Sequence, residues 1–121
     1  MSGAPVTILI TMRSHPGKLD ELIEQCRTVT GIGRGEHGAL SFSYSLEGDR
    51  MLAIETYADA AAYARHLELA ATIVAHAEDL AEIERISIIA TPDDLELLDE
   101  VITGYGATPV SAVAGFQHGS S

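Results

Sequence analysis

The stretch LSFSYSLEGDRMLAIETYADAAAYARH, residues 40–66, decides the fold. Its first seven residues alternate apolar or aromatic side chains with serines, which is the pattern of a strand with one buried face. The sequence EGDR at 47–50 predicts a hairpin turn, and residues 51–57 predict the returning strand. Asp59 is a typical N-cap residue and precedes an alanine-rich run. The stretch therefore predicts a strand, a hairpin, a second strand and a helix in succession.

The remaining elements follow from similar local patterns. The β-branched apolar run VTILITM is typical of a strand, and Ser14 or His15 can cap a helix that has Pro16 in its first turn. Thr91 and Asp94 form a capping box for a later helix. The predicted elements are a strand over 6–12, a helix that begins near 16 and ends at the glycines from 31 onward, a helix from 59 to about 80, a strand over 84–90, a helix from 92 to about 103 and a strand over 108–116.

This order of elements predicts an α+β fold in which the whole chain, 1–121, is a single domain. We expect a ferredoxin-like split βαβ sandwich, with an antiparallel sheet and both main helices on one face. The other face would stay open, and a second copy of the chain is the simplest cover for it. We therefore predict a homodimer that forms a dimeric α+β barrel. Its covered face would carry apolar residues such as Leu40, Phe42, Tyr44 and Leu46, or their counterparts on neighbouring strands.

Composition excludes several classes of function. The chain has 18 acidic and 7 basic residues and a net charge of −11, which disfavours binding to nucleic acids and anionic membranes. Its single cysteine excludes an internal disulfide and a cysteine-rich zinc site. No apolar run approaches the roughly 20 residues of a membrane span. We expect a soluble cytoplasmic protein.

His66 is the first candidate for a catalytic residue. Tyr63 lies three residues before it on the predicted helix, and Glu55 and Tyr57 share one face of the preceding strand. A carboxylate beside an imidazole sets its tautomer and raises its basicity, as a general base requires. We predict His66 as the base and Glu55 or Asp59 as its orienting carboxylate. The alternative is a histidine held by a hydrogen bond in a core or an interface.

The tyrosines and Phe42 are candidates for the wall of a substrate pocket. Tyr44, Tyr57 and Tyr63 can supply polar groups, and we expect the pocket beside His66 to measure at least about 300 Å³. The alternative for the aromatic stripe is ordinary core packing. The histidine spacing supports no metal site, and no glycine-rich phosphate loop opens a helix. We therefore expect no metal, flavin or nicotinamide cofactor.

Two segments resemble the antibiotic-biosynthesis monooxygenase-like family. The sequence EHGALSF, residues 36–42, is similar to the family's E-P-G-c-l turn and second strand. The spacing Glu55-x-Tyr57-x-Asp59-x-x-Ala62-x-x-x-His66 is similar to its signature E-x-[WY]-x-[DS]-x-x-A-x-x-x-H. The resemblance covers a monooxygenase-like core over residues 5–90. Residues 91–116 form a C-terminal extension of one helix and one strand.

The resemblance implies a homodimer that binds a small, often aromatic molecule. Members include cofactor-independent oxygenases of anthrones and quinols, haem-degrading enzymes and isomerases. The haem-degrading branch uses an Asn, which falls near Ile10 here, a Trp at the position of His66 and a haem-ligating His at the position of His76. The chain contains neither Asn nor Trp, so haem degradation is not expected.

The combined reading is a cofactor-independent monooxygenase that acts on a small electron-rich molecule of the phenol, quinol or anthrone type. His66, Glu55 and Asp59 are its predicted catalytic residues. An isomerase or lyase using the same base is the alternative enzyme. A non-catalytic dimer that binds a small ligand, or haem through His76, is the alternative outside catalysis.

Overall fold

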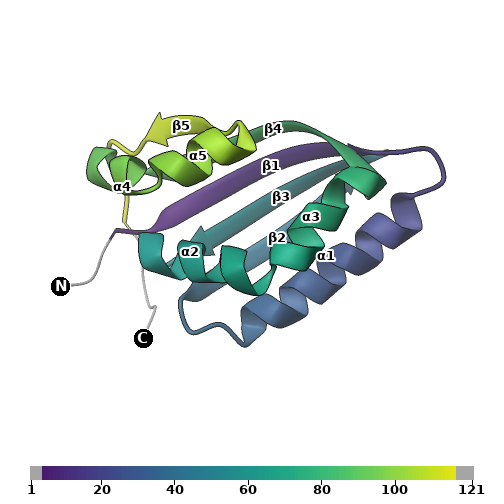
Figure 1. The fold of residues 1–121 in the computed structure, drawn as a ribbon, viewed down its shortest axis with the longest axis horizontal. Coiled ribbons are helices and arrows are strands. Elements are labelled where there is room, and N and C mark those ends of the chain that lie inside the picture. Colours follow the sequence, from purple (N-terminus) through teal and green to yellow (C-terminus); the bar gives the residue numbers. More distant parts are fainter. Residues whose placement is uncertain (1–3, 117–121) are drawn as a thin grey trace.

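The computed structural model describes residues 4–116, which form one sheet with helices packed on it (Figure 1). The predicted strands and helices all have counterparts, although their bounds differ. In chain order the elements are β1 (Val6–Ser14), α1 (Leu19–Arg34), β2 (Ala39–Glu47), β3 (Arg50–Tyr57), α2 (Ala60–Leu69), α3 (Ala71–Leu80), β4 (Ala81–Ala90), α4 (Pro92–Leu97), α5 (Asp99–Tyr105) and β5 (Thr108–Ser111).

The sheet has the strand order β2-β3-β1-β4-β5. The first four strands in this order pair antiparallel, which confirms the ferredoxin-like α+β fold. The fifth strand departs from the predicted antiparallel sheet, because β5 runs parallel to β4. The physical reason is the helical connection through α4 and α5. It carries the chain back along β4, so that β5 starts beside Ser87 and runs in the same direction as β4.

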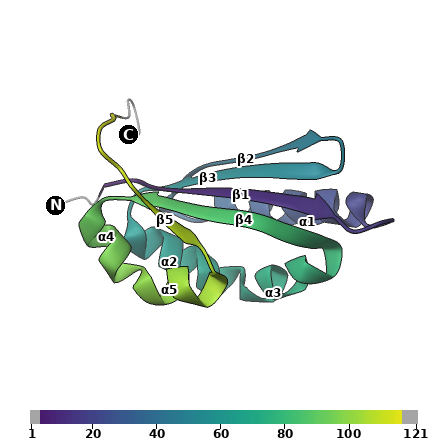
Figure 2. The same cartoon turned by 90° about the horizontal axis from the view of Figure 1, so that it is seen from above.

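The helices all lie on one face of the sheet, and no helix of residues 4–116 covers the other face (Figure 2). The buried core therefore lies between the sheet and the helices. Around one end of β1 it contains Val6, Ile8, Tyr57 and Ile88, and a second cluster gathers around Met12 and Leu22.

The aromatic stripe of β2 faces the helices, not the open face. Phe42 pairs directly with Glu55, and Tyr44 with Ala53, whose side chains are both buried beneath the helices. Leu9, Leu52 and Ile54, which are 37%, 38% and 46% exposed, are large apolar residues of the neighbouring strands on the opposite face. The expected apolar surface is therefore supplied by these counterparts on neighbouring strands.

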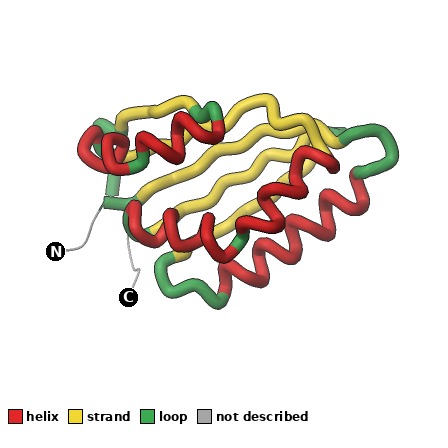
Figure 3. The backbone as a smooth tube through the Cα atoms, viewed as in Figure 1, coloured by secondary structure: helices red, strands yellow, loops and turns green. Residues whose placement is uncertain are grey.

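Two predicted helices are each divided in the structure. A single residue, Ala70, separates α2 from α3, and the break is visible in Figure 3. Its backbone dihedrals, φ −99° and ψ 9°, leave the helical region although no Pro or Gly marks the position. Leu98 separates α4 from α5 in the same way.

The other differences concern the ends of elements. The first helix begins after the cap residue Lys18, later than Pro16 suggested, and it continues through Gly31 and Gly33 to Arg34. The last strand ends at Ser111 instead of near Phe116. Within the described residues, no helix is long and apolar enough to cross a membrane.

Candidate functional site

A cavity of about 120 Å³ lies between the helical face of the sheet and the helices. It is smaller than the 300 Å³ or more that the sequence led us to expect. Its wall is mostly aliphatic, and its polar and aromatic residues are Gln25, Cys26, Tyr44, Glu55, Tyr63, His66 and Tyr105. Four of the predicted site residues, Tyr44, Glu55, Tyr63 and His66, therefore meet at one cavity.

His66 is held by a carboxylate that comes from a different part of the chain. Its Nδ1 lies 2.8 Å from Oε2 of Glu36, in the connection between α1 and β2. Both side chains are almost completely buried. Because a carboxylate only accepts hydrogen bonds, the proton of this pair lies on Nδ1. The Nε2 atom has no hydrogen-bond partner among residues 4–116, and in the neutral tautomer with its proton on Nδ1 this atom carries the lone pair.

Glu55 is bound by two tyrosine hydroxyl groups. Tyr44 donates to its Oε2 at 2.5 Å, and Tyr57 donates to its Oε1 at 2.7 Å. The three side chains come from the β2–β3 hairpin, whose register brings them together. Hydrogen bonds to a carboxylate are short and strong, and these two compensate part of the cost of burying Glu55. Glu55 therefore orients two tyrosines and does not contact His66 through a hydrogen bond.

Aromatic rings support His66 from behind. The ring centroid of Phe42 lies 5.2 Å from that of His66, and the ring of Tyr57 lies 5.4 Å away. Phe42 and Tyr57 do not line the cavity, so the structure places them behind the imidazole and not in the predicted wall. Their contacts restrict the position of the His66 ring, as a positioned base requires.

Burial controls the protonation of the tyrosines and the cysteine in and behind the cavity wall. The pKa values of Tyr44, Tyr57 and Tyr63 are raised above the ordinary value, first by burial and then by the charge of Glu55. The pKa of the Cys26 thiol is raised to about 11 by the same two causes. The three phenols and the thiol are therefore neutral near pH 7. Tyr63 has no hydrogen-bond partner among the described residues, so its hydroxyl is available to a ligand.

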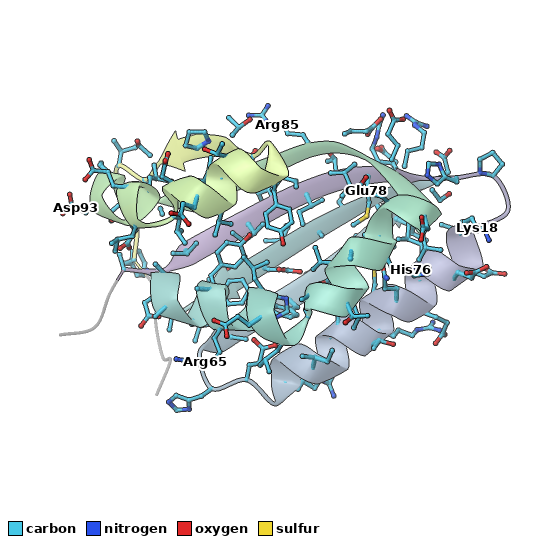
Figure 4. All side chains as sticks on the ribbon, viewed as in Figure 1. Lys18, Arg65, His76, Glu78, Arg85 and Asp93 are labelled. Carbon is cyan, nitrogen blue, oxygen red and sulfur yellow. The ribbon has the colours of Figure 1, made fainter. Side chains whose placement is uncertain are left out.

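Two predicted residues lie away from this arrangement. Asp59 caps α2, with its Oδ1 accepting a hydrogen bond from the backbone N–H of Ala62 at 2.8 Å. His76 is an exposed residue of α3 beside α1, where its Nδ1 lies 3.0 Å from Asp79 (Figure 4). His76 does not line the cavity. Residues 4–116 contain no cluster of three or more side chains that could hold a metal ion.

Sequence reasoning did not assign a role to Glu36. The only sequence signal for Glu36 is its place as the first residue of the EHG turn, which resembles the family motif. No spacing rule links it to His66, because the two residues are 30 positions apart. Gln25 and Tyr105 also enter the wall without a sequence signal that distinguishes them from other residues of their helices.

Comparison with solved structures shows which proteins share this fold. MupZ from Pseudomonas fluorescens is 19% identical over 98% of both chains, with a TM-score of 0.87. Rv0793 from Mycobacterium tuberculosis is 18% identical over 72% of this chain and 94% of its own, with a TM-score of 0.65. SnoaB, a cofactor-independent oxygenase from Streptomyces nogalater, is 16% identical over 70% of this chain and 90% of its own, with a TM-score of 0.63.

The sequence itself matches one family profile. The match is to antibiotic biosynthesis monooxygenase and spans residues 5–78, which is more than half of the chain. No curated protein sequence gives a significant match. The matched range contains both segments from which the resemblance was inferred, as well as Glu36, Glu55 and His66. The chain belongs to the antibiotic biosynthesis monooxygenase family.

Proposed function

We propose that this protein is a cofactor-independent monooxygenase that acts on a small electron-rich molecule of the phenol, quinol or anthrone type. The observation that carries the proposal is the buried His66–Glu36 pair, whose histidine lines the cavity. Membership of the family supports the reaction class. The fold shared with SnoaB, itself a cofactor-independent oxygenase, is consistent with it.

His66 performs the first step by accepting the proton of the substrate hydroxyl on Nε2. Glu36 holds Nδ1–H and stabilises the imidazolium that forms. Tyr63 donates a hydrogen bond to the phenolate oxygen that develops. The wall of the cavity is largely aliphatic, and an apolar environment strengthens both interactions.

The resulting phenolate supplies the electrons for oxygen. One electron passes to O₂, and the phenoxyl radical and superoxide combine at a ring carbon. The proton held by His66 then converts the peroxide anion to a hydroperoxide. Loss of the C–H proton and cleavage of the O–O bond release water and leave a quinone. One O₂ is consumed per substrate, with one oxygen atom in the product and one in water, so the step requires no external reductant.

The cavity size favours the smaller members of this substrate class. An engineered cavity of about 150 Å³ in another protein holds benzene. The present cavity of about 120 Å³ is somewhat smaller, so a single ring is the largest aromatic system that we expect it to take. A three-ring anthrone would fit only if the cavity widened.

Oxygen consumption with single-ring phenols and quinols tests the proposal. We expect His66→Ala to lower turnover by about 10²-fold or more, the usual contribution of a general base. Glu36→Gln keeps the size of its side chain but removes the charge, and should lower turnover by a smaller factor. His76→Ala is the matched control, because this histidine is exposed and lies outside the cavity.

Two results would contradict the assignment. Full activity of His66→Ala would exclude a catalytic role for this residue. Product formation without oxygen consumption would favour the isomerase or lyase alternative, which uses the same base.

We also infer that the protein acts as a homodimer. The open sheet face carries Leu9, Leu52 and Ile54 among threonine and serine side chains. An apolar patch of this kind is typical of a surface that a partner covers. A second copy supplies the same surface, so two sheets can face each other around a two-fold axis.

A further inference from the structure

A second hollow lies on the outer side of the cavity wall. This groove, of about 670 Å³, runs between α1 and β2, which lie alongside each other at the edge of the sheet (Figure 1). Its apolar lining includes Ile23, Phe42, Leu46 and Met51. Tyr44 and Cys26 line both the groove and the cavity, so these two side chains form the partition between them.

The charge of the groove is opposite to that of the whole protein. Arg27 and Arg34 line it, and no carboxylate does. The two arginines are seven positions apart on α1, so they lie on one face of the helix about two turns apart. In a chain with 18 acidic residues and only 7 basic ones, a groove whose charged lining residues are both arginines is a local exception.

Arg34 is available to a ligand. It forms no ion pair with any residue in the described range 4–116. Among residues 4–116, Arg27 pairs only with Glu24, and these two side chains are 71% and 68% exposed. An exposed pair of this kind is weak, so an incoming carboxylate can replace Glu24 at little cost.

Gly31 keeps the space between the two arginines open. It lies in the body of α1, where a glycine is less favourable than an alanine by roughly 0.5–1 kcal/mol. A Cβ atom at this position would meet nothing within 4 Å, so packing does not require glycine here. The missing side chain leaves room for a ligand along the helix.

We propose that the groove binds the anionic end of an elongated ligand whose aromatic end occupies the cavity. The proposal rests on the proposed function, because it takes the cavity as the site of the reacting ring. The ligand class is a phenol or quinol joined by a flexible chain to a carboxylate. The planar guanidinium groups of Arg27 and Arg34 match a carboxylate in shape and charge. To join the two hollows, the chain of the ligand must pass the partition that Tyr44 and Cys26 form.

A series of ω-(4-hydroxyphenyl)alkanoic acids and their primary amides tests this binding mode by isothermal titration calorimetry. Each acid and amide pair shares the ring and the chain and differs in charge. We expect acids that are long enough to reach the groove to bind about tenfold more tightly than their amides, as one charged hydrogen bond provides. The shortest pairs should show no such preference.

Variants that each remove one positive charge show which arginine is responsible for the preference for the acid. Arg34→Gln should remove most of the preference for the acid. Arg65→Gln is the matched control, because Arg65 is exposed on α2 and lines a different hollow. An equal loss in both variants would indicate the overall field of the protein and overturn the proposed subsite.

The outcomes separate the two proposals. Equal binding of acid and amide at every length, with the ring still bound, would overturn the anion subsite and leave the proposed function standing. If no compound in the series bound, both proposals would be wrong. A preference for the acid that depends on Arg34, with full turnover by His66→Ala, would support the subsite and contradict the catalytic assignment.

Discussion

At the scale of single residues, the buried tyrosines should make the protein less stable at high pH. The pKa values of Tyr44, Tyr57 and Tyr63 are raised in the folded chain by burial and by Glu55. A tyrosine in the unfolded chain has a pKa of about 10. The contribution of these tyrosines to the free energy of unfolding is therefore fully present below about pH 10 and is lost as the pH rises above it. Each of the three phenols should lower the free energy of unfolding by about 1.4 kcal/mol per pH unit in that range.

Tyrosinate absorbance followed together with circular dichroism measures this effect. The buried tyrosines should ionise in the same step in which the helices unfold. Tyr57→Phe should make the decline of stability with pH shallower, whereas Tyr105→Phe, at an exposed residue of α5, provides the comparison. Gradual ionisation near pH 10 with the fold intact would show that the phenols are not held as the structure indicates.

At the scale of elements, two glycines of α1 are expected to respond oppositely to alanine. Gly31→Ala should raise the free energy of unfolding by roughly 0.5–1 kcal/mol, because the added methyl group meets no neighbour. A Cβ atom at Gly33 would lie 2.3 Å from Cε2 of Phe42. Gly33→Ala should therefore destabilise the protein by about 1–3 kcal/mol, as overpacking does.

Urea denaturation of the two variants compares them directly. The gain in helix propensity is similar at both positions, so the difference between the variants reports the contact with Phe42. That ring also packs on His66, and Gly33→Ala should thus reduce turnover as well. Equal stability of the two variants would contradict the close packing of α1 on β2.

At the scale of the whole molecule, the open sheet face predicts a two-fold homodimer. We expect the interface to bury at least about 1,600 Å² in total. Ile54→Glu should dissociate the dimer by placing a charge beside Leu9, its pairing partner on this face. Leu97→Glu is the control, because Leu97 is 76% exposed on α4, on the helical side of the molecule.

Light scattering at micromolar concentration gives the mass of both variants and of the wild type. A monomeric wild type would overturn the prediction. Dissociation by Leu97→Glu but not by Ile54→Glu would move the interface to the helical side.

Much of the fold could be predicted from the sequence because its signals are local. The alternation over 40–46 and the EGDR turn identified the hairpin of β2 and β3. The helix starts at Asp59 and Thr91 are confirmed by side-chain hydrogen bonds to residues three positions later. Strand periodicity and helix capping act within a few residues, so a single segment contains all the information that they need.

The candidate site depended on contacts that no segment contains. His66 was identified from its neighbours in the sequence, but its carboxylate is Glu36, which is brought close by the packing of the α1–β2 connection against α2. Glu55 lies near His66 in sequence and is nevertheless bound by Tyr44 and Tyr57, because the hairpin register places those hydroxyl groups beside it.

Tertiary structure alone also decided the cavity and the break at Ala70. Local propensity favours a continuous helix over 60–80, since no Pro or Gly interrupts it. Packing divides it into α2 and α3, and Ala70 lines the cavity at the division. The sequence by itself determined which residues form strands and helices, because that choice is made by neighbours along the chain. Packing between distant segments decided the hydrogen-bond partner of His66, the size of the cavity and which side of β2 faces the helices. The geometry of that packing exists only in the folded chain.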